Sequence, residues 1–501
     1  MPIGYRVCAG SATTACGMPG AGVKALHRHV ALTGFMGAGK STIGYEVAAR
    51  IERPFVDVDV ELERLHGLSI PELFEQRGET WFRNAEAELT CRLLAAHEPA
   101  VLALGGGAVM RPETREALAR RAFTVLVDID VDEAWRRTAV VRNRPLARDE
   151  QRFRELYGER QPVYRETADA VADDVDEALL ACGGVVVEPG ASERVAGLVP
   201  GDGAVALIAD ERVLRLHALD LAPRLRQTLT VPSGEAAKQL PVCERLWDEL
   251  LLDRSGTVVA LGGGTATDVA GYVASAYLRG IPWVPVPSTL VGQVDAAIGG
   301  KTGIDLRKGK NLVGAFHLPE LVVIDPSLLS TLPEEQWREG LAEVVKTGLL
   351  AGRELWRLEP AELVRACAAF KVSVCLADPT ERGRRAILNL GHTFAHGLEA
   401  AAGYEALSHG RAVALGLRAA LLLSERHLGL DPDVRAEVEQ VLPVELATVD
   451  PERAWSAMAL DKKARDGMLR LVLLQALGRP LYGVELPPDE VRTALTTIIA
   501  A

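Results

Sequence analysis

Two groups of residues, near opposite ends of this 501-residue chain, have the types and spacing of catalytic sites. Residues 34–41 read GFMGAGKS, the G-x-x-x-x-G-K-S pattern of a phosphate-binding loop. Towards the other end, residues 391–396 (GHTFAH) and 408–410 (SHG) supply three of the ten histidines in the chain. The first group predicts a nucleotide site and the second a metal site, so the sequence indicates two reactions in one chain.

The phosphate-binding loop stands in the local setting that such loops require. A short apolar strand, residues 29–33, leads directly into it, and the chain from Ser41 to Arg50 has helical periodicity. Lys40 is expected to reach the outer phosphates and the Ser41 hydroxyl to bind Mg²⁺, while backbone N–H groups hold the rest. The predicted ATP contacts of this segment are Gly37, Ala38, Gly39, Lys40, Ser41 and Thr42. A chance match in a glycine-rich turn is the alternative.

Acidic and basic residues that suit phosphoryl transfer follow the loop. Residues 55–59 (FVDVD) read as a strand end with Asp57 and Asp59 on the same side. One carboxylate could hold Mg²⁺ and the other accept a substrate hydroxyl, or both could simply mark a polar strand exit. Arginines at 142–144 and Arg160 bracket a charged stretch with helical pattern. Arginines on a movable flap neutralise charge on a transferred phosphoryl group, whereas a solvated helix needs no such role.

The candidate metal site lies among helical patterns. Glu343 and Lys346 share one helix face, and His392 and His396 share another at a spacing that alone would make both histidines metal ligands. A set of basic and polar residues is expected to cluster in a glycine-rich loop, as an anion site requires: Lys301, Lys308, Lys310 and Asn311. Each of these residues, taken singly, could be an ordinary surface residue.

The composition is that of an ordinary soluble globular chain. Apolar residues make up 48% and charged residues 25%, and the net charge of −12 gives no basic surface for nucleic acid. The seven cysteines show no C-x-x-C pair, which argues against a disulfide framework and a cysteine zinc site. No apolar run approaches the length of a membrane span, and residues 1–28 lack the apolar core of a secretory signal. We therefore expect a cytoplasmic enzyme of small molecules with a flexible leader at 1–28.

The elements that must position these residues read as three α/β or helical parts. A Gly/Pro/Ser-rich stretch after Cys182 predicts a joint near Gly184. Beyond it, strands at 204–210 and 257–261 and a glycine turn before Asp268 indicate a Rossmann-like fold, and from Leu332 onward the pattern is helical almost throughout. The predicted fold class is α/β. The predicted parts are a P-loop kinase domain with a parallel sheet (29–183), a Rossmann-like NAD-binding domain (185–331) and a mostly α-helical metal and substrate domain (332–501).

The first part resembles shikimate kinase over 29–183. The residues that carry the resemblance are the loop, the Asp-x-Asp strand end, residues 78–86 (GETWFRNAE), the glycines at 105–107 and an arginine lid. The resemblance implies that shikimate is held by Asp59, Arg83, Gly106, Gly107 and Arg160, with Asp59 as the base for the 3-hydroxyl. It also implies that Ser41 and Asp57 bind Mg²⁺, that Arg144 is the lid arginine and that Arg137 lies near adenine. The lid between Arg144 and Arg160 is shorter than usual in that family.

The rest of the chain is similar to 3-dehydroquinate synthase over 185–501. Its matching stretches include residues 286–290 (VPSTL), 299–303 (GGKTG), 341–346 (LAEVVK), 388–393 (LNLGHT) and 461–463 (DKK). The resemblance implies zinc, or another divalent metal, on Glu343, His392 and His409. It places His396 near the substrate phosphate instead.

The same resemblance implies the remaining contacts of this half. Substrate would be bound by Arg279, Asp295, Lys301, Asn311, Lys346, Lys371, Arg385, Asn389, His396 and Lys463 or Lys462. NAD would be bound by Asp210, Glu235, Lys238, Gly263, Gly264, Asp268, Ser288, Thr289, Lys301 and Lys310. Among these, Lys346, Lys371, Arg385, Asn389 and His396 would act in catalysis. Arg279 corresponds to an arginine that reaches the neighbouring subunit, which implies a homodimer.

The two resemblances together imply a bifunctional enzyme of the shikimate pathway. One activity would be ATP-dependent phosphorylation of the shikimate 3-hydroxyl. The other would be NAD- and metal-dependent cyclisation of 3-deoxy-D-arabino-heptulosonate 7-phosphate to 3-dehydroquinate with release of phosphate. Three alternatives stay open: a cyclase with a nucleotide-sensing N-terminal domain, a sugar-phosphate cyclase of specialised metabolism, and a glycerol-dehydrogenase-like second half, which would not need the lysine loop.

Overall fold

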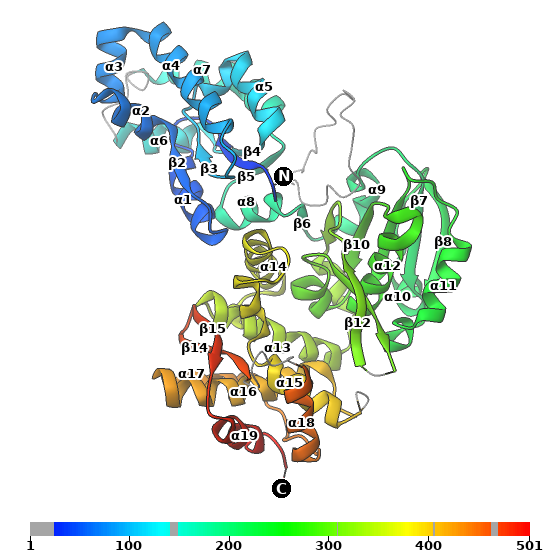
Figure 1. The fold of residues 1–501 in the computed structure, drawn as a ribbon. Coiled ribbons are helices and arrows are strands. Elements are labelled where there is room, and N and C mark those ends of the chain that lie inside the picture. Colours follow the sequence, from blue (N-terminus) through cyan, green and yellow to red (C-terminus); the bar gives the residue numbers. More distant parts are fainter. Residues whose placement is uncertain (1–24, 141–148, 308, 404–405, 462–468, 501) are drawn as a thin grey trace. The chain divides into compact units, whose positions relative to one another are not determined.

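The computed structural model describes residues 25–140, 149–307, 309–403, 406–461 and 469–500. The chain divides into two compact units, Met1–Val185 and Val186–Ala501, and each is described by itself (Figure 1). Five residues considered above lie outside the described residues, Arg142, Arg144, Lys308, Lys462 and Lys463, as does most of the predicted leader.

The first unit is built on a five-stranded parallel sheet. The strands are β1 (His29–Thr33), β2 (Phe55–Asp57), β3 (Val101–Ala103), β4 (Ala122–Val127) and β5 (Ala170–Ala172), in the order β2-β3-β1-β4-β5. Every neighbouring pair is parallel. The central strand β1 is buried along its whole length, as expected of a parallel strand covered on both faces.

Helices cover this sheet and bring the charged residues to one end of it. They are α1 (Lys40–Arg50), α2 (Val58–His66), α3 (Ile70–Arg77), α4 (Glu79–Leu94), α5 (Pro112–Arg121), α6 (Val131–Val140), α7 (Glu150–Thr167) and α8 (Val175–Cys182). Phe35, Phe82 and Phe153 are buried in the core between the helices and the sheet. The Asp149 side chain caps α7 by accepting hydrogen bonds from backbone N–H groups, which fixes the start of the helix that carries Arg160.

The prediction of one strand through residues 55–59 is wrong. Strand β2 ends at Asp57, and Asp59 lies in the first turn of α2. The cause is a helix cap: Asp57 Oδ1 accepts hydrogen bonds from the backbone N–H groups of Asp59 (3.0 Å) and Val60 (3.3 Å). The two carboxylates are therefore placed by a strand-to-helix corner and not by strand alternation.

The second unit begins with a four-stranded parallel sheet. Its strands are β7 (Val205–Asp210), β8 (Leu225–Val231), β9 (Thr257–Gly262) and β10 (Trp283–Pro287), in the order β10-β9-β7-β8. Its helices are α10 (Glu211–Leu216), α11 (Leu240–Glu249) and α12 (Gly264–Ala276), which lie around the sheet in Figure 1. A second small pairing joins β6 (Val185–Val187) to β13 (Val322–Ile324). The prediction that this part has a Rossmann-like α/β fold is confirmed.

The predicted lysine loop is an antiparallel hairpin instead. Strands β11 (Lys301–Leu306) and β12 (Gly309–Phe316) pair so that Lys301 faces Phe316 and Leu306 faces Gly309. Lys301 and Lys310 therefore lie near opposite ends of the hairpin, and the expectation that they cluster in one loop is wrong. Glycines at 303 and 314 read as loop residues in the sequence, but here they allow the two strand backbones to approach closely.

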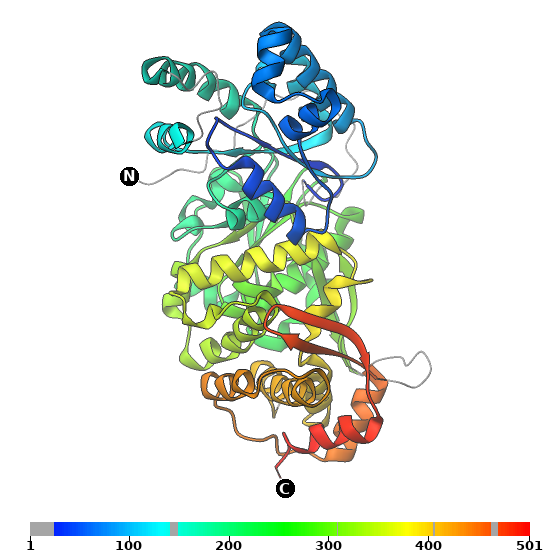
Figure 2. The ribbon, with the colours of Figure 1, turned by 90° about the vertical axis from the view of Figure 1, so that its left-hand side faces the viewer.

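The remainder of the second unit is mostly helical. Its helices are α13 (Glu334–Ala351), α14 (Pro360–Ala377), α15 (His392–Ala401), α16 (His409–Leu428), α17 (Pro432–Val441), α18 (Pro451–Asp461) and α19 (Pro488–Thr496). The pattern missed one hairpin, β14 (Arg470–Ala476) and β15 (Arg479–Glu485), drawn in red in Figure 2, which packs on α16. Leu471 to Leu474 are all buried, so a fully covered strand gives a continuous apolar run that also suits a helix.

None of the described helices is both long and apolar enough to span a membrane.

Candidate active sites

The phosphate-binding loop of the first unit lies between β1 and α1. Lys40 Nζ donates hydrogen bonds to the loop carbonyls of Gly34 (2.9 Å) and Phe35 (3.0 Å). The hydroxyl of Ser41 donates to Asp57 Oδ2 at 2.5 Å, so the two predicted magnesium residues are in contact. Arg137 lies close to the loop, since a Cβ on Gly39 would come within 3.9 Å of its Nη1. The loop thus presents backbone N–H groups, a lysine and a hydroxyl–carboxylate pair, the set that binds a magnesium nucleotide.

A second cluster in this unit combines carboxylates, arginines and the predicted glycine turn. Arg83 Nη1 donates to Glu86 Oε2 at 2.8 Å, and Arg160 Nη1 donates to the Gly106 carbonyl at 3.0 Å. A Cβ on Gly107 would collide with the Arg83 guanidinium, which explains why this position has no side chain. Asp59 borders the same turn, since a Cβ on Gly105 would lie 2.8 Å from its Oδ1. The predicted shikimate residues are therefore brought together.

Two further residues of this cluster were not predicted. The Glu86 carboxylate is almost fully buried, its Oε1 accepts no hydrogen bond among the described residues, and a Cβ on Gly105 would collide with that oxygen. Burial raises the pKa of Glu86, although the Arg83 guanidinium opposes the shift. The Tyr164 hydroxyl donates to the Gly106 carbonyl beside Arg160. The only signal for Glu86 was its place in residues 78–86, three positions after Arg83.

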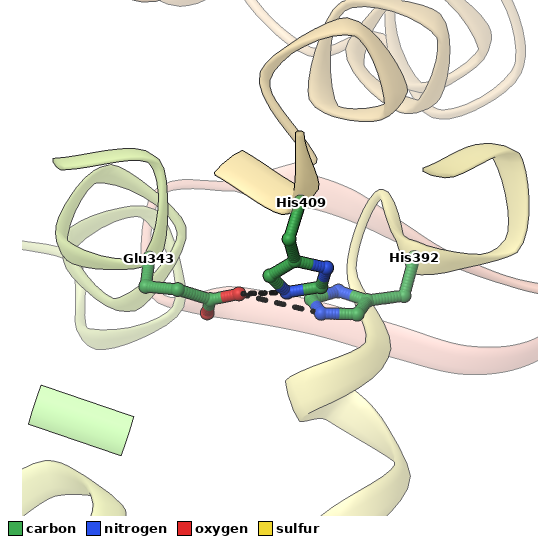
Figure 3. A group of neighbouring side chains, drawn as sticks. All are labelled: Glu343, His392 and His409. Atoms are coloured by element: carbon green, nitrogen blue, oxygen red, sulfur yellow. Dashed lines mark ion pairs between the residues drawn. The ribbon is translucent and has the colours of Figure 1, made fainter. Parts of the chain in front are cut away.

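The second unit contains a carboxylate and two histidines that converge from three helices (Figure 3). Glu343 Oε1 lies 3.4 Å from His392 Nε2 and 3.4 Å from His409 Nε2. One ligand atom from each of the three residues falls within 4.8 Å of the others. Gly391 has a left-handed backbone (φ 79°) and starts α15 so that His392 faces α13. Glu339 on α13 accepts hydrogen bonds from Gly410 N (2.6 Å) and Ser408 Oγ (2.5 Å), which holds the start of α16 and with it His409.

This group fits a divalent metal ion. Among the described residues, neither carboxylate oxygen of the fully buried Glu343 accepts a well-formed hydrogen bond, although Lys346 forms an ion pair with it. Burial would raise the pKa of Glu343, but Lys346 and His392 outweigh it and hold the pKa well below its usual range. An ionised carboxylate with two imidazole nitrogens is a donor set of catalytic zinc sites. Burial likewise opposes a charge on His409, but contacts with Glu343 and Glu399 raise its pKa to about 10.

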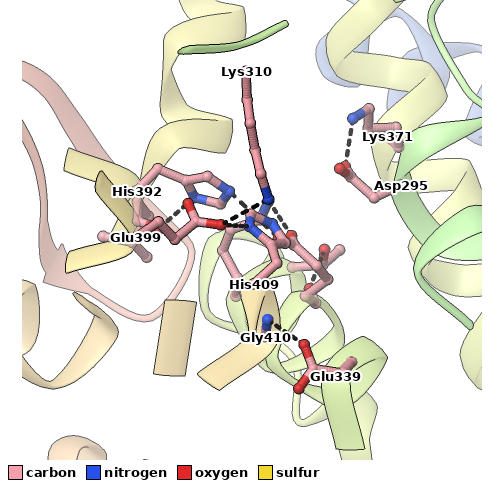
Figure 4. A network of polar contacts seen from close by, with 12 residues as sticks. Asp295, Lys310, Glu339, Lys371, His392, Glu399, His409 and Gly410 are labelled. Carbon is pink, nitrogen blue, oxygen red and sulfur yellow. Dashed lines mark hydrogen bonds and ion pairs between the residues drawn. The ribbon is translucent and has the colours of Figure 1, made fainter. Parts of the chain in front are cut away.

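The predicted substrate residues surround this group in two sets. Lys371 on α14 pairs with Asp295 in the short helix η6 (Gly292–Ala296), as Figure 4 shows, and Asp295 also interacts electrostatically with Lys346 and Glu343. Arg385, in η9 (Arg384–Asn389), is fully buried and donates from Nη2 to the Gly299 carbonyl at 3.0 Å. Its Nε has no partner among the described residues. His396 lies one turn after His392, with ring centroids 5.6 Å apart.

Glu381 joins the second set and was not predicted from the sequence. It pairs with Lys301, and its Oε1 accepts a hydrogen bond from Asn389 Nδ2 at 2.8 Å. Its backbone is left-handed (φ 56°), an uncommon conformation for a residue with a side chain. An internal carboxylate thus contacts two residues that were predicted to bind substrate, Lys301 and Asn389.

The predicted NAD residues gather at the ends of β7, β9 and β10. Asp210 caps α10, accepting from Arg212 N (2.8 Å) and Val213 N (3.1 Å), and the Ser233 hydroxyl donates to it at 2.7 Å. Gly262 ends β9 and Gly264 begins α12, and a Cβ on Gly263 between them would contact Thr289. Ser288 follows β10, and its buried hydroxyl has no partner among the described residues.

Two of the predicted lysines pair with predicted acidic residues in this half. Lys238 pairs with Asp268 at 2.6 Å and donates to Asn311 Oδ1 at 2.8 Å. Lys310 Nζ lies 3.9 Å from Glu235 Oε1, which follows β8. Arg279 stands at the end of η5 (Tyr277–Arg279) with a left-handed backbone (φ 67°), next to the exposed Leu278. The strand ends, the glycine turn and the caps together resemble a dinucleotide site at the carboxyl edge of a parallel sheet.

Comparisons with known proteins agree with both halves. The family model for shikimate kinase matches residues 36–188, and those for the N-terminal and C-terminal parts of 3-dehydroquinate synthase match 228–339 and 340–464. The 3-dehydroquinate synthase of Salinibacter ruber is 42% identical over 305 residues, which is 55% of this chain and 83% of the relative. A 2-epi-5-epi-valiolone synthase of Streptomyces hygroscopicus, solved with NAD+ and Zn2+ bound, is 27% identical with a TM-score of 0.56, over 63% of this chain and 96% of its own.

A phosphate-binding loop on one parallel sheet, and a carboxylate–histidine group beside another, define a two-site enzyme: a P-loop kinase joined to a cyclase of the dehydroquinate synthase fold. The bifunctional shikimate kinase/3-dehydroquinate synthase of Thermotoga maritima is 33% identical over 485 residues, covering 89% of this chain and 96% of the relative. The chain belongs to this bifunctional family. The predicted family and the predicted pair of catalytic halves are confirmed.

Proposed function

We propose that the first unit transfers a phosphoryl group from ATP to the 3-hydroxyl of shikimate. The second unit converts 3-deoxy-D-arabino-heptulosonate 7-phosphate to 3-dehydroquinate with release of phosphate. The observation that carries this proposal is that each half matches its family and also assembles a cluster of chemically suitable residues. Both reactions use small anionic substrates, which agrees with buried or half-buried arginines and lysines at both sites.

In the first unit, each predicted residue has a chemical task. Lys40 leaves the loop carbonyls to contact the outer phosphates of ATP, while Ser41 and Asp57 hold Mg²⁺, which supplies charge neutralisation to the phosphates. Asp59 accepts the proton of the substrate hydroxyl. Arg83 and Arg160, presented beside the glycine turn, bind the carboxylate of shikimate in the geometry that a guanidinium favours.

In the second unit, Glu343, His392 and His409 would hold Zn²⁺ or another divalent metal, and the metal supplies Lewis-acid polarisation of a substrate hydroxyl. Asp295 and Lys371 form a hydrogen-bonding pair for neighbouring hydroxyls. Lys346 orients Glu343 and balances its charge in a buried site. The further basic and polar groups bind the carboxylate and phosphate of the substrate: Lys301, Asn311, Arg385, Asn389 and His396.

The proposed NAD site is the carboxyl edge of the β7–β10 sheet. NAD supplies a reversible oxidation of the substrate, so no net redox change is expected. Gly263 and Gly264 let the backbone approach the pyrophosphate, and Asp210 is placed for the ribose hydroxyls. Glu235, Lys238, Asp268, Ser288, Thr289 and Lys310 complete the proposed contacts.

The organisation of the protein is part of the proposal. We assign the kinase to 29–183, the NAD-binding part of the cyclase to 185–331 and its helical part to 332–501. A homodimer through the cyclase half is supported by the strained backbone that presents Arg279 beside exposed Leu278. A cytoplasmic location is supported by the five described cysteines, all of them free thiols.

The first test is shikimate-dependent ADP formation by the intact chain. We expect activity with the wild type and loss of activity with Lys40→Ala. ATP binding without ADP formation would instead support a nucleotide-sensing domain. For the second unit, phosphate release should require a heptulose phosphate that carries a carboxylate, because we assign the binding of that carboxylate to Lys301 and Arg385. Faster release from a heptulose phosphate without a carboxylate would support a cyclase of specialised metabolism.

A further inference from the structure

The structure contains a buried carboxylate next to the metal residues that has no task in the reaction described above. Glu399 lies on α15, seven residues and about two turns after His392, so both point from the same side of the helix. Its side chain is only 4% exposed. A buried carboxylate requires a charged or hydrogen-bonding partner, because burial alone disfavours its ionised form.

The partner of Glu399 is the imidazole of His409. Glu399 Oε1 lies 3.4 Å from His409 Nδ1, while the opposite ring nitrogen of His409, Nε2, lies 3.4 Å from Glu343 Oε1 (Figure 4). The two nitrogens of one ring therefore contact two different carboxylates. One of these carboxylates belongs to the proposed metal site and the other does not.

The same oxygen of Glu399 also lies near a lysine. Lys310 Nζ, on β12, lies 3.9 Å from Glu399 Oε1. Lys310 is also 3.9 Å from Glu235, a residue of the proposed NAD site. Glu399 thus lies between Lys310 on β12 and His409 at the start of α16.

A carboxylate at one nitrogen of an imidazole affects how the other nitrogen binds a metal. A neutral histidine that binds a metal through Nε2 must carry its proton on Nδ1. A carboxylate that accepts this proton's hydrogen bond selects the tautomer, fixes the plane of the ring and makes Nε2 a stronger donor to the metal. Without it, Nδ1 can lose the proton and the ring can rotate about its Cβ bond.

We propose that Glu399 is a positioning residue of the metal site, which holds His409 through its Nδ1–H so that Nε2 is directed at the metal. The inference rests on the proposed metal site and adds a residue that does not touch the metal. It explains why a charged side chain is buried beside a proposed metal ligand: Glu399 orients His409. Glu399 is not a catalytic residue in this account.

The test is Zn²⁺ binding to the metal-free full-length protein, measured by competition with a chromophoric chelator. We expect Glu399→Gln to raise the dissociation constant about 10- to 100-fold, the usual effect of removing such a partner. The absorption spectrum of the Co²⁺-loaded variant should also differ from that of the wild type. The matched control is Glu425→Gln on α16, where a carboxylate that is 13% exposed pairs with Arg435, a residue outside the proposed metal site. Its metal affinity should equal that of the wild type.

Each other outcome has a defined meaning. Wild-type affinity and an unchanged Co²⁺ spectrum in Glu399→Gln would overturn the inference while the metal site stands. An equal loss in Glu425→Gln would also overturn it, because the effect would then be general destabilisation. If Glu399→Gln does not fold, Glu399→Asp decides: a folded variant that binds Zn²⁺ as tightly as the wild type contradicts the proposed role. If the wild type binds no Zn²⁺, or His392→Ala binds it equally well, the proposed metal site fails and the inference fails with it.

Discussion

The two catalytic sites of this chain differ in how their charged groups are satisfied before any ligand binds. In the kinase unit, Lys40 hydrogen-bonds to its own loop, Ser41 is exposed, and Asp57 is only half-buried. In the cyclase unit, Glu343, Lys346 and Arg385 are each about 1% exposed and lie among opposite charges. The charges of the phosphate-binding loop are therefore left for a nucleotide to neutralise. The charges of the cyclase site, in contrast, already neutralise one another before a metal or substrate binds.

This difference has an energetic consequence. A half-exposed charge can lose its partner to water at little cost, but a buried charge that loses its partner destabilises the fold by about 3–5 kcal/mol. Substitutions at Lys40, Ser41 and Asp57 should thus reduce kinase activity with little effect on stability. Equivalent substitutions in the cyclase site should reduce both.

The largest effect is expected for Glu343→Gln. The variant loses a metal ligand and leaves the buried Lys346 without its ion-pair partner, so cyclase activity should fall about a thousandfold or more. Bound zinc per chain and phosphate release are the measurements, and the unfolding midpoint should fall as well. Glu354→Gln, at a half-exposed surface carboxylate, is the control. Unaltered zinc content in Glu343→Gln would contradict the assignment.

Lys40→Ala should lower kinase activity about 10²- to 10³-fold, the usual effect of removing one preorganised group that stabilises developing charge. Shikimate-dependent ADP formation measures this. In contrast to Glu343→Gln, the unfolding midpoint should stay at the wild-type value. Arg50→Ala at the other end of α1 should retain full kinase activity, and a similar loss there would point to damage of the helix.

Asp325→Asn should destabilise the cyclase unit by about 2–4 kcal/mol without altering the kinase. Asp325 is fully buried and accepts five hydrogen bonds, from Gly190, Ser192 and Ser327. Burial would raise its pKa, but the hydrogen bonds from the two serines outweigh it and lower the pKa. Its contribution is therefore complete above the unfolded pKa of about 3.9 and is lost as pH falls through the lower folded pKa.

Urea unfolding at neutral and acidic pH, followed by cyclase activity and by tryptophan fluorescence, measures the effect of Asp325→Asn. The difference between wild type and variant should shrink at acidic pH. A difference that grows as the pH falls would contradict the assigned direction of the shift.

Glu86→Gln should raise the KM for shikimate about tenfold, because the variant weakens one charge-assisted hydrogen bond that orients Arg83. The KM for ATP should change little, since the contacts of Glu86 are with Arg83 and the glycine turn. Steady-state kinetics with each substrate varied in turn separate the two. An equal rise in both KM values would show that the kinase fold, and not the substrate contact, was disturbed.

The smallest effect is expected when the chain is divided between Gly183 and Gly184. Each compact unit has its own sheet and core, so each fragment should fold alone and retain its activity. Assays of the two purified fragments, alone and mixed, measure this. A fragment that is inactive alone but active in the mixture would show that the two units depend on each other.

The sequence predicted best those features that depend on neighbouring residues. The phosphate-binding loop, α1 and the start of α15 at His392 follow from local spacing and from glycines. Fold class was predictable for the same reason, because parallel strands buried on both faces give continuous apolar runs. The strand end at Asp57 was misread because a side-chain cap competed with strand alternation.

What could not be predicted depends on contacts between distant segments. Glu381 meets Lys301 from 80 positions away, and Glu399 meets His409 only because α15 and α16 fold back on each other. The sequence around a helical glutamate does not show which distant residue the glutamate will pair with. The same reason explains the hairpin of β11 and β12, whose glycines suit both a loop and a close strand pair.

The central claim is that one chain carries two independent catalytic sites. The direct test assays both reactions in three full-length proteins: the wild type, Lys40→Ala and His392→Ala. The account predicts that the wild type has both activities, that Lys40→Ala keeps only the cyclase and that His392→Ala keeps only the kinase. A wild type that lacks either reaction, or a variant that loses both, would contradict it.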